Sequence, residues 1–126
     1  MCFIIFIPLV PVPSVTINAP SNQTVGQSLT LESSITTVRG ITSRVDIVWS
    51  SNGIELKRIM GANASSTNGN TEVYEDTYHI PLLSTTDDVR VIECEIVIMT
   101  TPSIVATNNV TLDVTGKYSK VSILLL

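Results

Sequence analysis

Charge is scarce in this chain of 126 residues, because only 14% of the residues are charged, well below the rough quarter of an ordinary soluble domain. Asp and Glu (11) outnumber Lys and Arg (7), the formal net charge is -4 at pH 7, and no run of like charges occurs. Without a basic patch, the chain has no electrostatic means of holding a phosphate backbone or an anionic lipid surface. We therefore set nucleic-acid binding aside. Aromatic residues are also few, at 5%, and the abundance of Ser, Thr, Asn, Val and Ile is typical of β-strands joined by polar turns.

The usual signs of catalysis are missing as well. The one histidine, His79, lies by alternation on the outward face of a strand, where a solvated histidine is expected. There is no G-x-S-x-G nucleophile elbow and no glycine-rich phosphate loop. Cys94 stands between two glutamates, which favour the neutral thiol over the thiolate. We expect no enzymatic activity, no cofactor and no metal ion. Four nearby carboxylates fit no calcium loop, and we expect surface acids at Asp87, Asp88, Glu93 and Glu95.

Long hydrophobic runs are absent, although both ends of the chain are apolar. Residues 1–13 (MCFIIFIPLVPVP) contain three prolines, and residues 116–126 (GKYSKVSILLL) end in an aliphatic tail. Neither is long enough to cross a bilayer, which takes about 20 apolar residues. The first segment has the apolar stretch of a secretory signal but no clear basic start or cleavage site. We divide the chain into a flank at 1–13, one domain at 14–115 and a tail at 116–126 outside the domain.

The codons of both flanks offer a second interpretation. Codons for Phe, Ile, Leu and Pro are rich in pyrimidines, as is the tract before an intron acceptor. Pro11-Val12 can be encoded by CCA-GTN, which contains the AG that ends an acceptor site. The codons of Gly116-Lys117-Tyr118 can contain the donor consensus GTAAGTAT. Under this hypothesis, residues 1 to about 12 and 117–126 are translated intron around a single exon. Absence of the splice dinucleotides at both places in the genomic sequence would reject it.

Between the flanks, apolar and polar residues alternate, with no helical stripe and no internal repeat. The clearest run is residues 90–98 (RVIECEIVI). Other segments alternate in the same way, namely residues 15–17, 29–33, 45–49, 54–57, 73–83 and 110–114. Residues 61–70 (GANASSTNGN) show no periodicity and are predicted to form an exposed loop. About seven or eight short strands separated by turn signals predict an all-β sandwich of two antiparallel sheets.

The order of landmarks resembles an immunoglobulin-like domain across residues 14–115. GQSLTL at 26–31 is similar to the family's strand B, Trp49 to the tryptophan of strand C, and YHIPLL at 78–83 to strand E. Asp88 stands six residues before Cys94, like the aspartate that precedes strand F in the family. The resemblance implies an immunoglobulin-like β-sandwich with 7–8 strands.

The chain departs from the family at the disulfide. Ser33 occupies the strand B position of the first cysteine, so the inter-sheet bridge to Cys94 cannot form. Ile92 replaces the tyrosine of the family's corner before strand F. Loss of such a bridge costs about 2–5 kcal/mol, so packing must hold this domain together. The other cysteine, Cys2, lies in the flank, and we expect no disulfide. We expect buried Trp49 and Cys94 to face each other across a sandwich about 10 Å thick.

Three N-x-[ST] sequons occur, at Asn22, Asn63 and Asn109. The predicted strands place Asn22 in a turn, Asn63 in the long loop and Asn109 on the outward face of the last strand, all within reach of a glycosyltransferase. Together with a family that works mostly outside cells, they favour a glycoprotein at the cell surface or in the extracellular space.

The resemblance implies a non-enzymatic module for recognition or adhesion in a larger cell-surface or secreted protein. Its partners would be a protein or glycan on other cells or matrix, and neighbouring domains of the same chain. The candidate contact loops are residues 40–42, 61–70 and 99–103. Two alternatives remain, a structural spacer in a tandem array and a fibronectin type III-like binding module, a fold that also lacks the disulfide.

Overall fold

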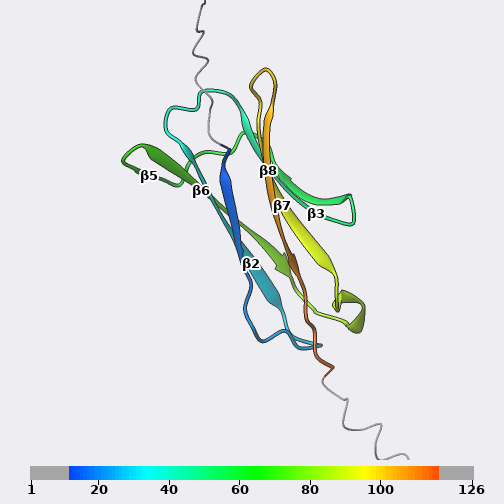
Figure 1. Cartoon of the computed structure of the whole chain (residues 1–126). Helices are drawn as coiled ribbons and strands as arrows, with labels where there is room; N and C mark the ends of the chain where they lie inside the picture. Colours follow the sequence, from blue (N-terminus) through cyan, green and yellow to red (C-terminus); the bar gives the residue numbers. More distant parts are fainter. Residues whose placement is uncertain (1–11, 117–126) are drawn as a thin grey trace, which may run out of the picture.

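The computed structural model describes residues 12–116, which form two antiparallel four-stranded sheets packed face to face (Figure 1). In chain order the elements are β1 (Ser14–Asn18), β2 (Leu29–Val38), β3 (Val45–Ser51), β4 (Ile54–Ile59), β5 (Ser66–Asn68), β6 (Thr71–Ile80), the 3-10 turn η1 (Thr85–Asp87), β7 (Val91–Ile98) and β8 (Ile104–Thr111). The predicted all-β sandwich is confirmed. Within residues 12–116, no helix is long and apolar enough to cross a membrane.

The strand order is that of an immunoglobulin-like domain. One sheet has the order β1-β2-β6-β5 and the other β4-β3-β7-β8. These correspond to strands A, B, E and D in one layer and C, F and G in the other, with β4 added beside C. The motif at 26–31 leads into β2, Trp49 lies in β3 and Cys94 lies in β7.

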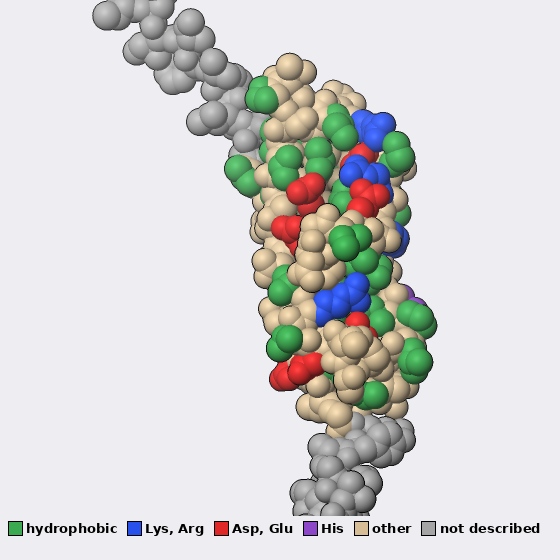
Figure 2. Space-filling model, turned by 90° about the vertical axis from the view of Figure 1, so that its right-hand side faces the viewer, with side chains coloured by type: hydrophobic (Ala, Val, Ile, Leu, Met, Phe, Trp, Pro, Cys, Tyr) green, Lys and Arg blue, Asp and Glu red, His purple; other side chains and the backbone are tan. Residues whose placement is uncertain are grey.

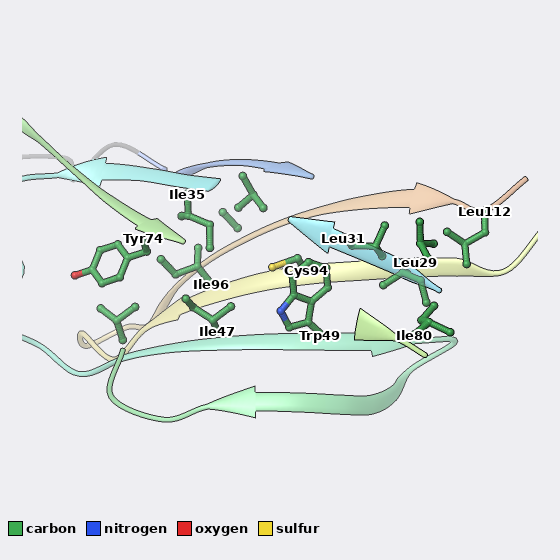
Figure 3. Packing of buried hydrophobic residues seen from close by; sticks show 14 of the residues in the cluster. Leu29, Leu31, Ile35, Ile47, Trp49, Tyr74, Ile80, Cys94, Ile96 and Leu112 are labelled. Atoms are coloured by element: carbon green, nitrogen blue, oxygen red, sulfur yellow. The ribbon is translucent and has the colours of Figure 1, made fainter. Parts of the chain in front are cut away.

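Alternation along the strands builds the core between the two sheets. In β7, Ile92, Cys94, Ile96 and Ile98 are at most 1% exposed, while the residues between them are half-buried on the outer face. Strand β2 follows the same pattern. Figure 3 shows the side chains of both layers pointing toward one another around Trp49, which is fully buried. Core burial of this kind is the main term that holds such a sandwich together.

Trp49 is buried close to Cys94, as expected, but the two do not face each other across the sandwich, which corrects the expected geometry. They are direct cross-strand partners on β3 and β7 of the same sheet. Across the sandwich, the Cys94 thiol donates a hydrogen bond to the Ser33 hydroxyl, with 3.2 Å between Sγ and Oγ. The Trp49 indole N–H donates to the Asp76 carboxylate at 2.8 Å. Ser33 and Asp76 are themselves cross-strand partners on β2 and β6. Two adjacent hydrogen bonds, Cys94 to Ser33 and Trp49 to Asp76, therefore join the sheets.

Two predicted boundaries also need correction. The segment 61–70 is not all loop, because it contains β5, whose three residues are all exposed and therefore show no apolar alternation. The last strand begins at Ile104 and ends at Thr111, whereas we predicted residues 110–114. Leu112 and Val114 follow it and are buried in the core. Both misplaced strands lie at sheet edges, where polar residues weaken the pattern.

Asp87 is not a surface acid as predicted, because it is 8% exposed at the turn before β7. Its carboxylate accepts the backbone N–H of Ser84 at 2.9 Å and pairs with Arg90 at 3.1 Å. Its neighbour Asp88 is exposed and accepts the Val114 backbone N–H at 2.9 Å. These carboxylates fix the turn before β7, the strand in which Ile92 stands where the family has its corner tyrosine.

One pair of sheet edges is closed by hydrogen bonds. The Asn108 side-chain amide of β8 donates to the Val15 carbonyl of β1 at 2.8 Å. After Pro20 the chain crosses between the layers, and Thr24 forms a parallel bridge with Thr115. Buried Gln23 accepts the Asp113 backbone N–H at 2.8 Å. The flank at 1–13 and the tail at 116–126 lie outside the described residues except for 12–13 and 116.

Candidate functional site

The three loops that the sequence singled out meet at one end of the sandwich, at the top of Figure 1. The Met99 backbone N–H donates to the Arg44 carbonyl at 2.9 Å, and the Ala62 N–H donates to the Val45 carbonyl at 2.7 Å. We call this region the loop end and define it as residues 38–44, 60–65, 69–72 and 98–104. Backbone bonds between segments far apart in sequence make it a preformed surface.

Buried Asp46 anchors the loop end. Its side chain lies on the outer face of β3 and is 0% exposed. Both carboxylate oxygens accept from the Arg44 guanidinium at 2.9 Å, and Arg58 adds a third contact at 3.0 Å. The Gly61 backbone N–H donates to it at 3.2 Å. The Arg44 hydrogen bond is the main reason that the pKa of Asp46 lies well below its usual range, although burial opposes the shift.

The sequence alone does not single out Asp46, because alternation places it on an outward face and outward acids are usually solvated. The sequence does contain one sign of an ion pair at Asp46: Arg44 stands two residues earlier, and residues i and i+2 of a strand share a face. The second arginine and Gly61 come from β4 and the segment after it. Only the fold brings those groups to the same carboxylate.

Two hollows flank the loop at residues 38–44. The first, of about 380 Å³, lies between this loop and residues 61–64 and is lined by the polar side chains of Asn63, Glu72 and Tyr74, among others. The Glu72 carboxylate accepts the Gly40 backbone N–H at 3.1 Å. Burial, and next the charge of Glu72, raise the pKa of Tyr74. The second hollow, of about 270 Å³, lies between residues 38–43 and residues 98–104 and has a more aliphatic lining.

All three sequon asparagines, Asn22, Asn63 and Asn109, are exposed. Asn63 lines the first hollow of the loop end. Asn109 lies on the outer face of β8, opposite Glu93 of β7. Asn22 precedes buried Gln23 at the other end of the sandwich. Each position offers room for a glycan outside the core.

The groups considered for catalysis lie apart and have other partners. Burial raises the pKa of the Cys94 thiol to about 11, so the thiol is neutral near pH 7. His79 is exposed, and its Nδ1 lies 2.8 Å from the Thr30 hydroxyl. In the described part of the chain, no group of three His, Cys, Asp or Glu side chains is arranged to hold a metal ion. Figure 2 shows acidic and basic side chains interleaved on the viewed face.

No protein-family model and no curated protein matches this chain. Among solved structures, it is similar to the CARDB domain of the PF1109 protein from Pyrococcus furiosus, solved in complex with di-metal ions. That match has 16% identity, covers 84% of this chain and 90% of that chain, and has a TM-score of 0.50. A second match is MHC-like MILL2, with 19% identity, 79% of this chain, 34% of that chain and a TM-score of 0.49. At 16% identity, the likeness to the CARDB domain shows the fold alone, an immunoglobulin-like β-sandwich.

Proposed function

We propose that the chain is a non-enzymatic recognition or adhesion module of a larger cell-surface or secreted protein, and that it binds a protein or glycan through the loop end. The observation that carries this proposal is the meeting of three separate loops on one rigid end of the sandwich, held by Asp46 and by backbone bonds. Rigid scaffolds that present several loops together are where binding residues concentrate.

A matched pair of substitutions tests the loop end. Met99 is 40% exposed at this end, and Leu82 is 66% exposed in the turn before η1 at the opposite end. A multimerised, secreted form of the full chain is offered to a panel of intact cells and to a glycan array. Met99→Glu should abolish the binding seen with the parent chain, and Leu82→Glu should preserve it. Equal binding by both variants, with unchanged thermal midpoints, would reject the loop end as the contact surface.

The exposed sequons support the extracellular part of the proposal. When the chain is expressed through a secretory pathway, peptide N-glycosidase F should reduce its mass. Replacement of Asn22, Asn63 and Asn109 by Gln, one at a time, should remove one glycan each. A secreted protein with no mass change after the enzyme would contradict the assignment of these sites.

A structural spacer in a tandem array is the second candidate function. One observation favours it: Val12 lies beside residues 36–38 near the loop end, whereas Thr115 pairs with Thr24, which precedes β2 at the opposite end. A chain that enters and leaves at opposite ends suits a string of domains. For a spacer, neither Met99→Glu nor Leu82→Glu would change binding by the whole protein.

A further inference from the structure

The second hollow of the loop end has the character of a side-chain pocket. Its walls include the aliphatic side chains of Val38, Ile41, Ile98 and Ile104, which come from β2, the following loop, β7 and β8. Ile98 is 1% exposed, and Ile41 and Ile104 are half-buried. A cavity of about 150 Å³ can hold benzene, so a hollow of about 270 Å³ has room for a branched aliphatic side chain.

Among the residues that the structure describes, the one charged residue that lines this hollow is Arg39. Arg39 is exposed, and its guanidinium donates to the Gly69 carbonyl at 3.4 Å. Among residues 12–116, the other basic side chains each form an ion pair with a carboxylate, namely Arg44, Lys57, Arg58 and Arg90. Glu72, the nearby acid, bonds Gly40 and lines the first hollow instead. The lining of the second hollow therefore includes one basic residue that, within residues 12–116, has no carboxylate partner.

The walls of this hollow are held in place before any ligand arrives. The Met99 backbone N–H bonds the Arg44 carbonyl across the two loops. Within the second loop, the Thr100 hydroxyl donates to the Pro102 carbonyl at 2.8 Å. The Arg39 backbone N–H donates to the Asn70 carbonyl at 2.9 Å. Such preorganisation lowers the entropic cost of binding.

We propose that this hollow receives a branched aliphatic side chain of a protein ligand, and that Arg39 pairs with a carboxylate next to that side chain. This inference rests on the proposed function and names its partner class, an acidic and aliphatic protein segment. Charge complementarity selects the carboxylate, and the aliphatic walls select the side chain. A glycan is the alternative ligand that the test must separate, because the hydroxyl groups of Thr42, Ser43 and Thr100 also line the hollow.

The test uses small probes and the full chain with labelled isoleucine methyl groups. The probe 4-methylpentanoate combines a branched aliphatic chain with a carboxylate, and 4-methylpentan-1-amine carries the opposite charge. We expect 4-methylpentanoate to shift the methyl signals of Ile41, Ile98 and Ile104 in a saturable way, and the amine to bind several-fold more weakly. Arg39→Gln should remove the preference for the carboxylate over the amine, and Ile41→Ser should weaken the binding of both probes. Ile54→Ser is the control, because Ile54 is 68% exposed at the opposite end.

Several results would overturn this inference. Unsaturable shifts, equal affinity for both probes, or saturable binding of N-acetylglucosamine in place of 4-methylpentanoate would each reject it. The proposed function can fail or stand separately. If Met99→Glu abolishes binding to cells while Arg39→Gln leaves it unchanged, the loop end is the contact surface and the acidic-aliphatic ligand is wrong. If 4-methylpentanoate binds as expected but neither variant changes cell binding, the pocket chemistry holds and the loop-end function fails.

Discussion

The centre of the sandwich and the second hollow of the loop end use polar groups in different ways. At the centre, Trp49 and Cys94 of one sheet bond Asp76 and Ser33 of the other, so the polar atoms satisfy one another inside the protein. At the loop end, Arg39 keeps its charge at the surface. Within the described residues, no buried side-chain nitrogen or oxygen lacks a hydrogen-bond partner. We therefore expect the free energy of unfolding and the proposed binding to depend on separate sets of residues.

Trp49→Ala should have the largest effect. The indole is fully buried, stacks on Tyr78 with 5.9 Å between ring centroids, and bonds Asp76. Its loss leaves a cavity, so the free energy of unfolding should fall by about 3–5 kcal/mol. Urea unfolding followed by circular dichroism measures the change. An unchanged midpoint would mean that the tryptophan is exposed.

Asp76→Ala should have the next largest effect. Asp76 accepts the Trp49 indole N–H at 2.8 Å and pairs with Lys57 at 3.0 Å. Removing it leaves the indole N–H without a partner between the sheets, and we expect a loss of about 1.5–3 kcal/mol. The matched control is its exposed neighbour, Glu75→Ala, which should stay within about 0.5 kcal/mol of the parent. If the two variants lose equal stability, the bond between the sheets does not contribute.

Alkaline pH should lower the free energy of unfolding by a smaller amount, through the Cys94 thiol at the centre. An unfolded cysteine titrates near 8.5 or so, whereas burial raises the pKa of folded Cys94 to about 11. A raised pKa in the folded state means that stability is full below the unfolded value and falls as pH rises toward the folded one. Between pH 7 and pH 9.5 the loss should be about 1.4 kcal/mol. In Cys94→Ala, the free energy of unfolding should change less with pH over this range. If it falls as steeply with pH as in the parent, Cys94 is not the source of the loss.

Arg39→Gln should have the smallest effect on folding. The guanidinium is exposed and forms one long hydrogen bond, to Gly69. The free energy of unfolding should stay within about 0.5 kcal/mol of the parent. Thermal unfolding measures it, with Arg90→Gln for comparison, because Arg90 bonds both Asp87 and Ser51. A marked loss of folding free energy in Arg39→Gln would contradict the view that stability depends on the centre and not on Arg39.

The fold class could be read from the sequence because alternation is a local property. Each face of β7 is visible in the run RVIECEIVI, and no distant contact is needed to interpret it. Alternation could not show which strands are neighbours, which is why Trp49 and Cys94 were assigned to opposite sheets. Strand β5 was missed because its three exposed residues pair with β6 through backbone bonds alone.

The candidate site was less predictable than the fold. The loops at 40–42, 61–70 and 99–103 are candidates because the family resemblance implies binding through end loops, and their meeting at one end depends on the strand order. Asp46 needs Arg44, Arg58 and Gly61 together to account for its burial. This cluster joins the start of β3, strand β4 and the residues after β4. No sequence pattern within one of these segments shows that the others come to the same carboxylate.

The most direct test of this account is the number of free thiols in oxidised Ser33→Cys. The account places Ser33 against Cys94 between the two sheets, at the family's disulfide position, with 3.2 Å between Oγ and Sγ. In a Cys2→Ser background, we predict no free thiol, one disulfide to Cys94 and a stability gain of about 2–4 kcal/mol. Two free thiols in the oxidised, folded protein would contradict the account, because Ser33 would then lie on the other face of β2.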